Sequence, residues 1–138
     1  MGKHLLKLGL YLSKLRHAEY VWGQTDCNLF VADWVDTIYN TNTAGEIRGK
    51  YSDAVSAVRF ARHYTQAPDW LADQGYTQCD CTDAHQYESG DILLQHPGAY
   101  YAGWLVLMGM AYSMTPESGL VTVPAHKLTD YTHWRNTK

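Results

Sequence analysis

The sequence has few cysteines, few charges and no apolar run long enough to cross a membrane. Its three cysteines, Cys27, Cys79 and Cys81, are too few and too irregularly spaced for a disulfide framework. Charged residues make up only 18% of the chain, and the net charge of −3 argues against a nucleic-acid-binding protein, whose affinity depends on neutralising phosphates. The apolar run of residues 104–114 is too short to span a bilayer.

The composition of the chain is that of one globular domain. Apolar residues make up 46% of the 138 residues, and a chain of this length suits a single hydrophobic core. We therefore predict one domain over residues 1–138. It would consist of an N-terminal amphipathic helix (1–17), a helical half (18–75) and an antiparallel sheet half (76–138). Eleven tyrosines and five tryptophans exceed the needs of a small core and suggest contact surfaces.

The N-terminal segment lacks the continuous apolar region and the small-residue cleavage site of a secretory signal peptide. Its leucines instead follow a helical period, which leaves two readings open. The helix either docks on its own domain, or its basic residues 3–17 meet a membrane or a partner. The breadth of the apolar face favours docking over membrane contact. The residues of that face are Leu5, Leu8, Leu12 and Leu15, with Leu6, Leu10 and Tyr11 broadening it.

The remaining pattern predicts helices first and strands second. Apolar residues recur at three- and four-residue spacing over 26–39, after Thr25 or Asp26 as N-cap. Turn residues follow at 40–45, Ser52 would cap another helix, and a short helix covers 68–74. The expected strands are 91–95, 100–108, 110–114 and 120–123, and the tail 128–134 adds a strand or packs irregularly. This order predicts an α+β fold whose sheet is an antiparallel meander.

Cys27 falls in the first turn of the predicted helix over residues 26–39. Unpaired backbone N–H groups and the positive end of the helix dipole lie there, and both favour a thiolate nucleophile. A cysteine on the apolar side of a helix is also a common small core residue. Position alone favours the core interpretation.

The surrounding pattern resembles the NlpC-type papain-like cysteine peptidases. The WGxxDC turn (Trp22, Gly23, Asp26 and Cys27) leads into the helix, and Gly90-Asp91 leads into an apolar strand of the sheet. The resemblance implies a papain-like NlpC-type fold, in which the cysteine opens a helix packed across a small antiparallel sheet.

Further elements are similar to NlpC-like proteins encoded in the tail modules of tailed bacteriophages. These elements are an RGxY motif (Arg48, Gly49 and Tyr51) and Gly-Leu-Val at 119–121, so the likeness covers residues 21–124. It implies a tail-tip protein that is made in the bacterial host cytoplasm and resides in the virion. Other phage tail proteins would be its partners, with peptidoglycan as a further one and no cofactor.

One position departs from the family pattern. The strand after Gly-Asp should open with the catalytic histidine, but aligning residues 102–104 with its usual Val-Gly-Ile places Tyr101 there. Phenols are poor general bases at neutral pH. Ser113 falls near the third catalytic position, and His96, in the preceding turn, offers an alternative base, although an exposed turn residue is the favoured interpretation. The histidines without motif support, which we expect at the surface, are His63, His85, His126 and His133.

Three other groups invite simpler interpretations. Cys79 and Cys81, with Asp83 and His85 nearby, have the residue types of metal ligands but lack a second ligand pair, which favours an exposed loop and no metal. Arg48 is expected to form a structural ion pair beside a turn at Gly49. The last group, Asp33 and Asp36, should lie on the solvated face of the helix.

Two functions follow as hypotheses. The favoured one is a structural or assembly component of a phage tail, in which the peptidase fold is catalytically degenerate. The alternative is an active cysteine endopeptidase or amidase that cleaves peptidoglycan stem peptides during genome entry. Cys27 would then be the nucleophile, His96 or another histidine the base, and the backbone N–H of Cys27 part of an oxyanion hole.

Overall fold

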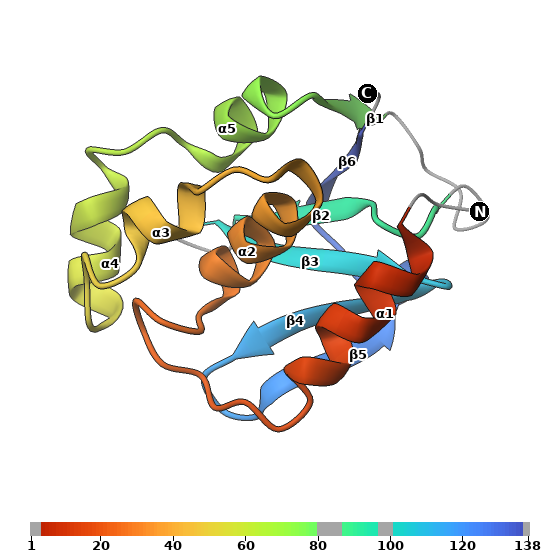
Figure 1. The fold of residues 1–138 in the computed structure, drawn as a ribbon, viewed down its shortest axis with the longest axis horizontal. Helices are drawn as coiled ribbons and strands as arrows, with labels where there is room; N and C mark the ends of the chain where they lie inside the picture. Colours follow the sequence, from red (N-terminus) through yellow and green to blue (C-terminus); the bar gives the residue numbers. More distant parts are fainter. Residues whose placement is uncertain (1–3, 80–86, 97–100, 137–138) are drawn as a thin grey trace.

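A computed structural model describes residues 4–79, 87–96 and 101–136 and shows helices packed on an antiparallel sheet (Figure 1). The predicted α+β class is confirmed. The helices of the described residues are α1 (Leu5–Lys14), α2 (Cys27–Tyr39), α3 (Thr43–Ile47), α4 (Ala54–Ala61) and α5 (Ala67–Asp73). The strands are β1 (Tyr76–Cys79), β2 (Ile92–Gln95), β3 (Ala102–Leu107), β4 (Met110–Thr115), β5 (Gly119–Pro124) and β6 (Tyr131–Asn136), with a 3₁₀ turn at Ala125–Lys127.

The sheet is a meander only in part. Strands β2 to β5 are consecutive neighbours, but β6 returns to lie between β1 and β2, which gives the order β1-β6-β2-β3-β4-β5. Every pairing is antiparallel. The strand β1 is not among the predicted strands, and Cys79, expected in an exposed loop, is instead the last residue of β1. The tail does add a strand, β6, in a central position.

The helix α2 lies across the sheet against β3 and β4 (Figure 1). Its first residue is Cys27 and its N-cap is Asp26, whose carboxylate accepts the backbone N–H groups of Asn28 and Leu29. The prediction that the thiol opens a helix lying against an antiparallel sheet is therefore confirmed. The contact with β3 is close, because Gly103 leaves room for Val31, whose Cγ2 would lie 2.4 Å from a Cβ at that glycine.

The two faces of the sheet carry separate cores. The larger core joins α1, α2 and α5 to one face through residues that include Leu8, Trp34, Leu71 and Leu105. A smaller cluster lies on alternate residues of the strands. Its buried members are Leu93, Val106, Ala111 and Ala125, the last of which begins the 3₁₀ turn.

The helix α1 is docked on the domain, as the breadth of its leucine face predicts. Leu8 and Leu12 are buried, and the hydroxyl of Tyr11 donates to the carbonyl of Phe30 on α2 over 2.6 Å. The prediction that Leu6 and Leu10 broaden the buried face is wrong, because their side chains are 77% and 60% exposed. No helix among the described residues has the length and apolar character needed to cross a bilayer.

Three local predictions need correction. The expected turn at 40–45 contains the start of α3, whose first backbone N–H groups, those of Thr43 and Ala44, donate to Asp36. Asp36 is therefore a helix-capping residue as well as part of the outer side of α2. The N-cap of α4 is Asp53 rather than Ser52, because the Asp53 carboxylate accepts the N–H of Ser56 in a capping box.

Candidate functional site

The buried carboxylate of Asp26 organises the loop before the thiol. Besides capping α2, it accepts the backbone N–H of Gly23 over 2.9 Å and the hydroxyl of Tyr51 over 2.5 Å. The Asp26 side chain is 1% exposed, so each of these hydrogen bonds replaces water that the carboxylate has lost. The aspartate of WGxxDC and the tyrosine of RGxY thus belong to one structural unit.

The rest of the RGxY motif completes this unit. Gly23 adopts a left-handed φ of 78°, and a Cβ there would lie 1.9 Å from the carbonyl oxygen of Tyr51, so only glycine fits. The N–H of Gly49 donates to the carbonyl of Gly23 over 3.0 Å. Arg48 pairs with Asp33 and also donates to the carbonyl of Gln24. The predicted structural ion pair of Arg48 and the turn at Gly49 are confirmed, and Asp33 is a partner rather than only a solvated residue.

The thiol of Cys27 lies in a nearly closed environment. The residue is 4% exposed, the hydroxyl of Tyr20 is 3.9 Å from its sulfur, and the carbonyl oxygen of Tyr101 is 4.0 Å away. Burial, followed by the negative charge of Asp26, raises the pKa of Cys27 to about 11. These two effects outweigh the pull of the helix N-terminus toward a thiolate, so the thiol is protonated at neutral pH.

Tyr101 contacts the thiol and His96 contacts Tyr101, but none of Tyr101, His96 and Ser113 brings a basic side chain to the sulfur in the described contacts. Tyr101 approaches the sulfur through its backbone carbonyl, and its ring stacks on the imidazole of His96 with centroids 4.1 Å apart. His96 is exposed. Ser113 is buried on β4, where its hydroxyl donates to the carbonyl of Gly103 over 2.6 Å. Among the described contacts of the Cys27 sulfur there is no imidazole.

Asp91 of the Gly90-Asp91 element forms a cluster of polar side chains with His133 and Arg135 of β6. Asp91 is 2% exposed, lies 2.6 Å from Nε2 of His133 and accepts two hydrogen bonds from Arg135. Burial acts against ionisation of Asp91, but hydrogen bonds from His133 and Arg135 outweigh it and hold the carboxyl pKa below its usual value. Gly90 permits the turn before the strand with a φ of 96°.

The prediction that His133 lies at the surface is wrong, because its side chain is 2% exposed. Two features explain this burial. The strand β6, which carries His133, lies inside the sheet between β1 and β2, and the ring of Tyr87 covers the imidazole with ring centroids 5.1 Å apart. His63 and His126 are exposed, as predicted. His85 lies outside the described residues.

A pocket opens beside the thiol, between α2, α3, α4, α5 and the edge of β3. We call it the aromatic pocket; its volume is about 100 Å³. Asn28, Tyr101 and Gly103, which are neighbours of Cys27 in sequence or space, line it, while Cys27 is not among its described lining residues. The six rings that face it are Trp22, Tyr51, Phe60, Tyr64, Trp70 and Tyr101. The sequence signalled this pocket only through its high aromatic content.

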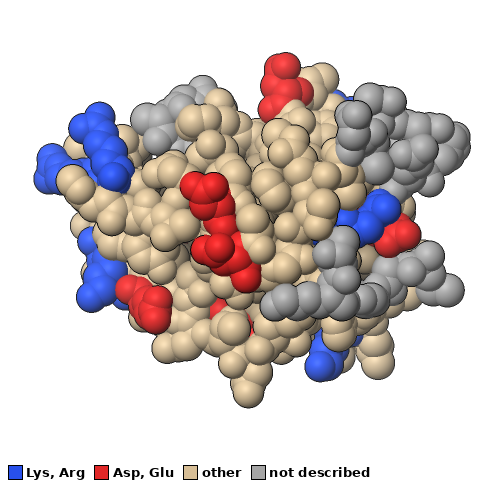
Figure 2. All heavy atoms as spheres, turned by 90° about the horizontal axis from the view of Figure 1, so that it is seen from above, with Lys and Arg blue, Asp and Glu red and all other residues tan. Residues whose placement is uncertain are grey.

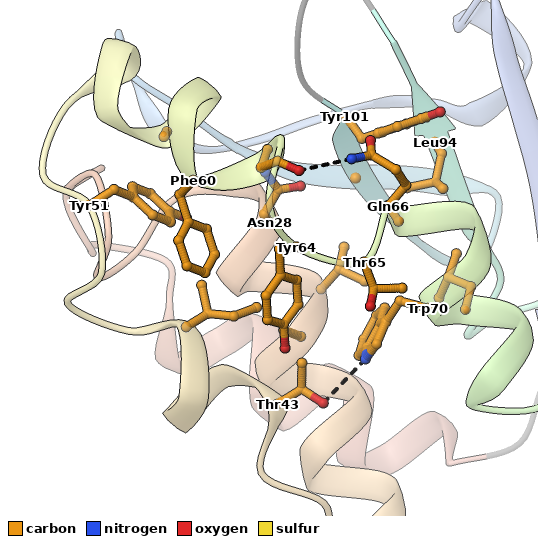
Figure 3. Close-up of a pocket in the computed structure, with 18 of the residues that line it drawn as sticks. Asn28, Thr43, Tyr51, Phe60, Tyr64, Thr65, Gln66, Trp70, Leu94 and Tyr101 are labelled. Atoms are coloured by element: carbon orange, nitrogen blue, oxygen red, sulfur yellow. Dashed lines mark hydrogen bonds between the residues drawn. The ribbon is translucent and has the colours of Figure 1, made fainter.

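Figure 3 shows how the rings are arranged around the aromatic pocket. Tyr51 and Phe60 lie at one side of the view, and Trp70 and Tyr101 lie at the other. The indole N–H of Trp70 donates to the hydroxyl of Thr43 over 3.2 Å, which fixes that ring against α3. This hydrogen bond holds the Trp70 ring in place as one wall of the aromatic pocket.

The four residues whose types would suit a metal, although no metal site is predicted for them, divide between described and undescribed parts of the chain. Cys79 ends β1 and is a strand residue, whereas Cys81, Asp83 and His85 lie outside the described residues. Within the described ranges, no three His, Cys, Asp or Glu side chains group in a way that could hold a metal ion.

Comparison with known proteins gives a family but no activity. A family model described as "Domain of unknown function (DUF6950)" matches residues 5–135. The chain belongs to this family. No curated protein and no solved structure matches the chain. For this DUF6950 member, the chemistry of the site is therefore the main guide to function.

Proposed function

We propose that this DUF6950 protein is a structural or assembly component of a phage tail tip, built on an NlpC-like papain-type fold that no longer catalyses hydrolysis. It would be made in the cytoplasm of the bacterial host and become part of the virion. The observation that carries the proposal is the environment of Cys27. A thiol at the N-terminus of a helix on a sheet is buried beneath Tyr20 and Tyr101, with Tyr101 at the expected histidine position.

The chemistry of acyl transfer explains why this environment disfavours catalysis. A cysteine nucleophile must be ionised or must give its proton to a nearby base. The pKa of Cys27 is raised rather than lowered, and the adjacent Asp26 carboxylate adds negative charge where a thiolate would form. The Asp26 carboxylate accepts hydrogen bonds from Gly23 and Tyr51, as expected of a residue with a structural role.

Two measurements test the two parts of the proposal. Purified protein is incubated with peptidoglycan sacculi, and soluble muropeptides are quantified against a Cys27→Ala variant; equal release from both, at the level of buffer alone, is expected. Phage particles from the host that produces this chain are then fractionated and analysed by mass spectrometry. We expect the chain in purified tails, and its absence from particles would reject the tail assignment.

The alternative, an active peptidoglycan endopeptidase or amidase, has one supporting observation. The imidazole of His96 stacks on Tyr101, whose carbonyl contacts the Cys27 sulfur, so movement of the His96 side chain past Tyr101 is the route by which a base would reach the thiol. Under this alternative, Cys27→Ala and His96→Ala would both abolish muropeptide release by the wild-type protein. A loss with Cys27→Ala alone would point to another base.

A further inference from the structure

The described residues that line the aromatic pocket carry no formal charge. Each of its described lining residues is apolar, aromatic, or a neutral amide or hydroxyl residue. A charged ligand group would lose its hydration there without gaining a counter-charge, which is costly. The stem peptides of peptidoglycan carry carboxylates and therefore fit this pocket poorly. Its occupant should be uncharged.

The volume of the pocket and the hydrogen bonds of its polar groups further limit the class of ligand that it can bind. Its volume of about 100 Å³ is below the roughly 150 Å³ of an apolar cavity that accepts benzene, so it accommodates one side-chain-sized group. Two of its polar groups already have partners within the protein: Thr43 accepts from Trp70, and Gln66 donates to the carbonyl of Ala61. A sugar would need several available polar partners, whereas an apolar group needs none.

The wall formed by α4 is incompletely packed. None of its residues is buried, yet Ala57, Phe60 and Ala61 face the pocket. Ring contacts join this wall to the loops beside it, with Phe60 5.7 Å from Tyr51 and 5.2 Å from Tyr64 between centroids. An apolar group in the pocket would supply the buried contacts that α4 lacks. Figure 2 shows that the molecular surface on the α5 side is also largely uncharged, apart from a few acidic and basic groups.

We propose that the aromatic pocket binds a single uncharged apolar side chain of another protein in the same assembly. This inference rests on the proposed function, because it identifies what a non-catalytic tail protein of this fold would hold. The partner side chain would be the main contact of this interface, because interface hot spots commonly consist of one side chain that fills a pocket with aromatic walls.

The binding step can be measured with capped amino acids. Isotopically labelled protein is titrated with N-acetyl-leucine amide and N-acetyl-phenylalanine amide, and chemical shifts are followed by NMR, including the indole signals of Trp22 and Trp70. We expect saturable shifts at pocket residues with a dissociation constant on the order of 1 mM for at least one of the two probes. N-acetyl-glutamate amide and N-acetylglucosamine should bind at least tenfold more weakly.

A matched pair of variants separates pocket binding from general surface effects. Ala61→Phe places a ring in the pocket and should weaken binding of the preferred probe at least tenfold. Ala54→Phe makes the same change on the same helix at an exposed position that does not line the pocket, and it should leave binding unchanged. Thermal unfolding of both variants verifies that they are folded, and Ala57→Leu replaces Ala61→Phe if the latter is not.

Three results would overturn the inference. They are an absence of saturable shifts with both apolar probes, tighter binding of the glutamate or sugar probe, and pocket shifts that depend on protein concentration alone, which would indicate a second copy as occupant. Failure of the proposed function is distinguishable from these, because probe binding by the isolated chain does not require the chain to reside in tails.

Discussion

The hydroxyl of Tyr51 donates to the buried carboxylate of Asp26 across 25 positions of sequence and a distance of 2.5 Å. This hydrogen bond joins the loop between α3 and α4 to the turn that precedes the thiol. Because Asp26 also caps α2, the position of Cys27 depends on a contact outside its own helix. The same bond fixes Tyr51 as a wall of the aromatic pocket.

Removing the Tyr51 hydroxyl tests the contribution of its hydrogen bond with Asp26 directly. Tyr51→Phe deletes one donor to a buried carboxylate, and we expect the free energy of unfolding to fall by about 1–3 kcal/mol. Urea denaturation followed by circular dichroism measures the change. Tyr64→Phe is the control, since the Tyr64 hydroxyl makes only an exposed 3.5 Å contact with Glu46 and should cost little. Equal effects of the two variants would mean that the Asp26 contact is unimportant.

The packing of α2 on β3 predicts a specific rescue. Gly103→Ala places a methyl group 2.4 Å from Cγ2 of Val31 and should destabilise the protein by about 1–3 kcal/mol. Val31→Ala removes the clashing methyl group, so the double variant should be more stable than the sum of the two single changes predicts. Thermal unfolding of all four proteins gives the coupling energy. Simple additivity would argue against the close approach of α2 and β3.

The ion cluster at Asp91 predicts loss of stability in acid. Because the pKa of Asp91 is lowered in the folded state, the unfolded state takes up protons first as the pH falls. The contribution of Asp91 is therefore complete above its ordinary pKa of about 3.9 and declines below it. Unfolding free energies measured from pH 6 to pH 2.5 should fall at the acid end. Asp91→Asn should be less stable at pH 6 and should lose part of that slope, and an unchanged slope would contradict the assignment.

Docking of α1 predicts different roles for neighbouring leucines. Leu8 is fully buried, so Leu8→Ala should cost about 2–5 kcal/mol. Leu6→Ala removes the same atoms from a side chain that is 77% exposed and should change stability by less than about 0.5 kcal/mol. Chemical denaturation of both variants provides the comparison. A large cost for Leu6→Ala would show that the helix buries a different face.

Several local features were predictable from the sequence because they depend on neighbouring residues, although α3 and the Asp53 cap of α4 were missed. The period of α2 and the turn at Gly49 follow from spacing and residue type, which also limit the N-cap of α2 to Thr25 or Asp26; the structure selects Asp26. The four-leucine face of α1 was also identified, but its width was overestimated, since Leu6 and Leu10 lie off the docked stripe.

Long-range pairings were not predictable in the same way. The short strand β1 contains Gln78 and Cys79 and acquires its hydrogen bonds only when β6, more than 50 residues later, lies beside it. His133 and Arg135 are two residues apart, which places both side chains on one face of a strand. That spacing was a usable signal of a joint role, but only the register of β6 against β2 brings both to Asp91.

The protonation of Cys27 in the folded protein is the most direct measure of the central claim, that the thiol is a buried structural group. Alkylation by iodoacetamide is followed at the Cys27 peptide by mass spectrometry from pH 5 to pH 11, with urea-unfolded protein as the control. With a pKa of about 11, Cys27 is almost entirely in the thiol form at pH 7. We therefore expect slow modification that rises toward the alkaline limit and remains far below the unfolded rate. Rapid modification on a plateau below pH 7 would reveal an activated thiolate and contradict the account.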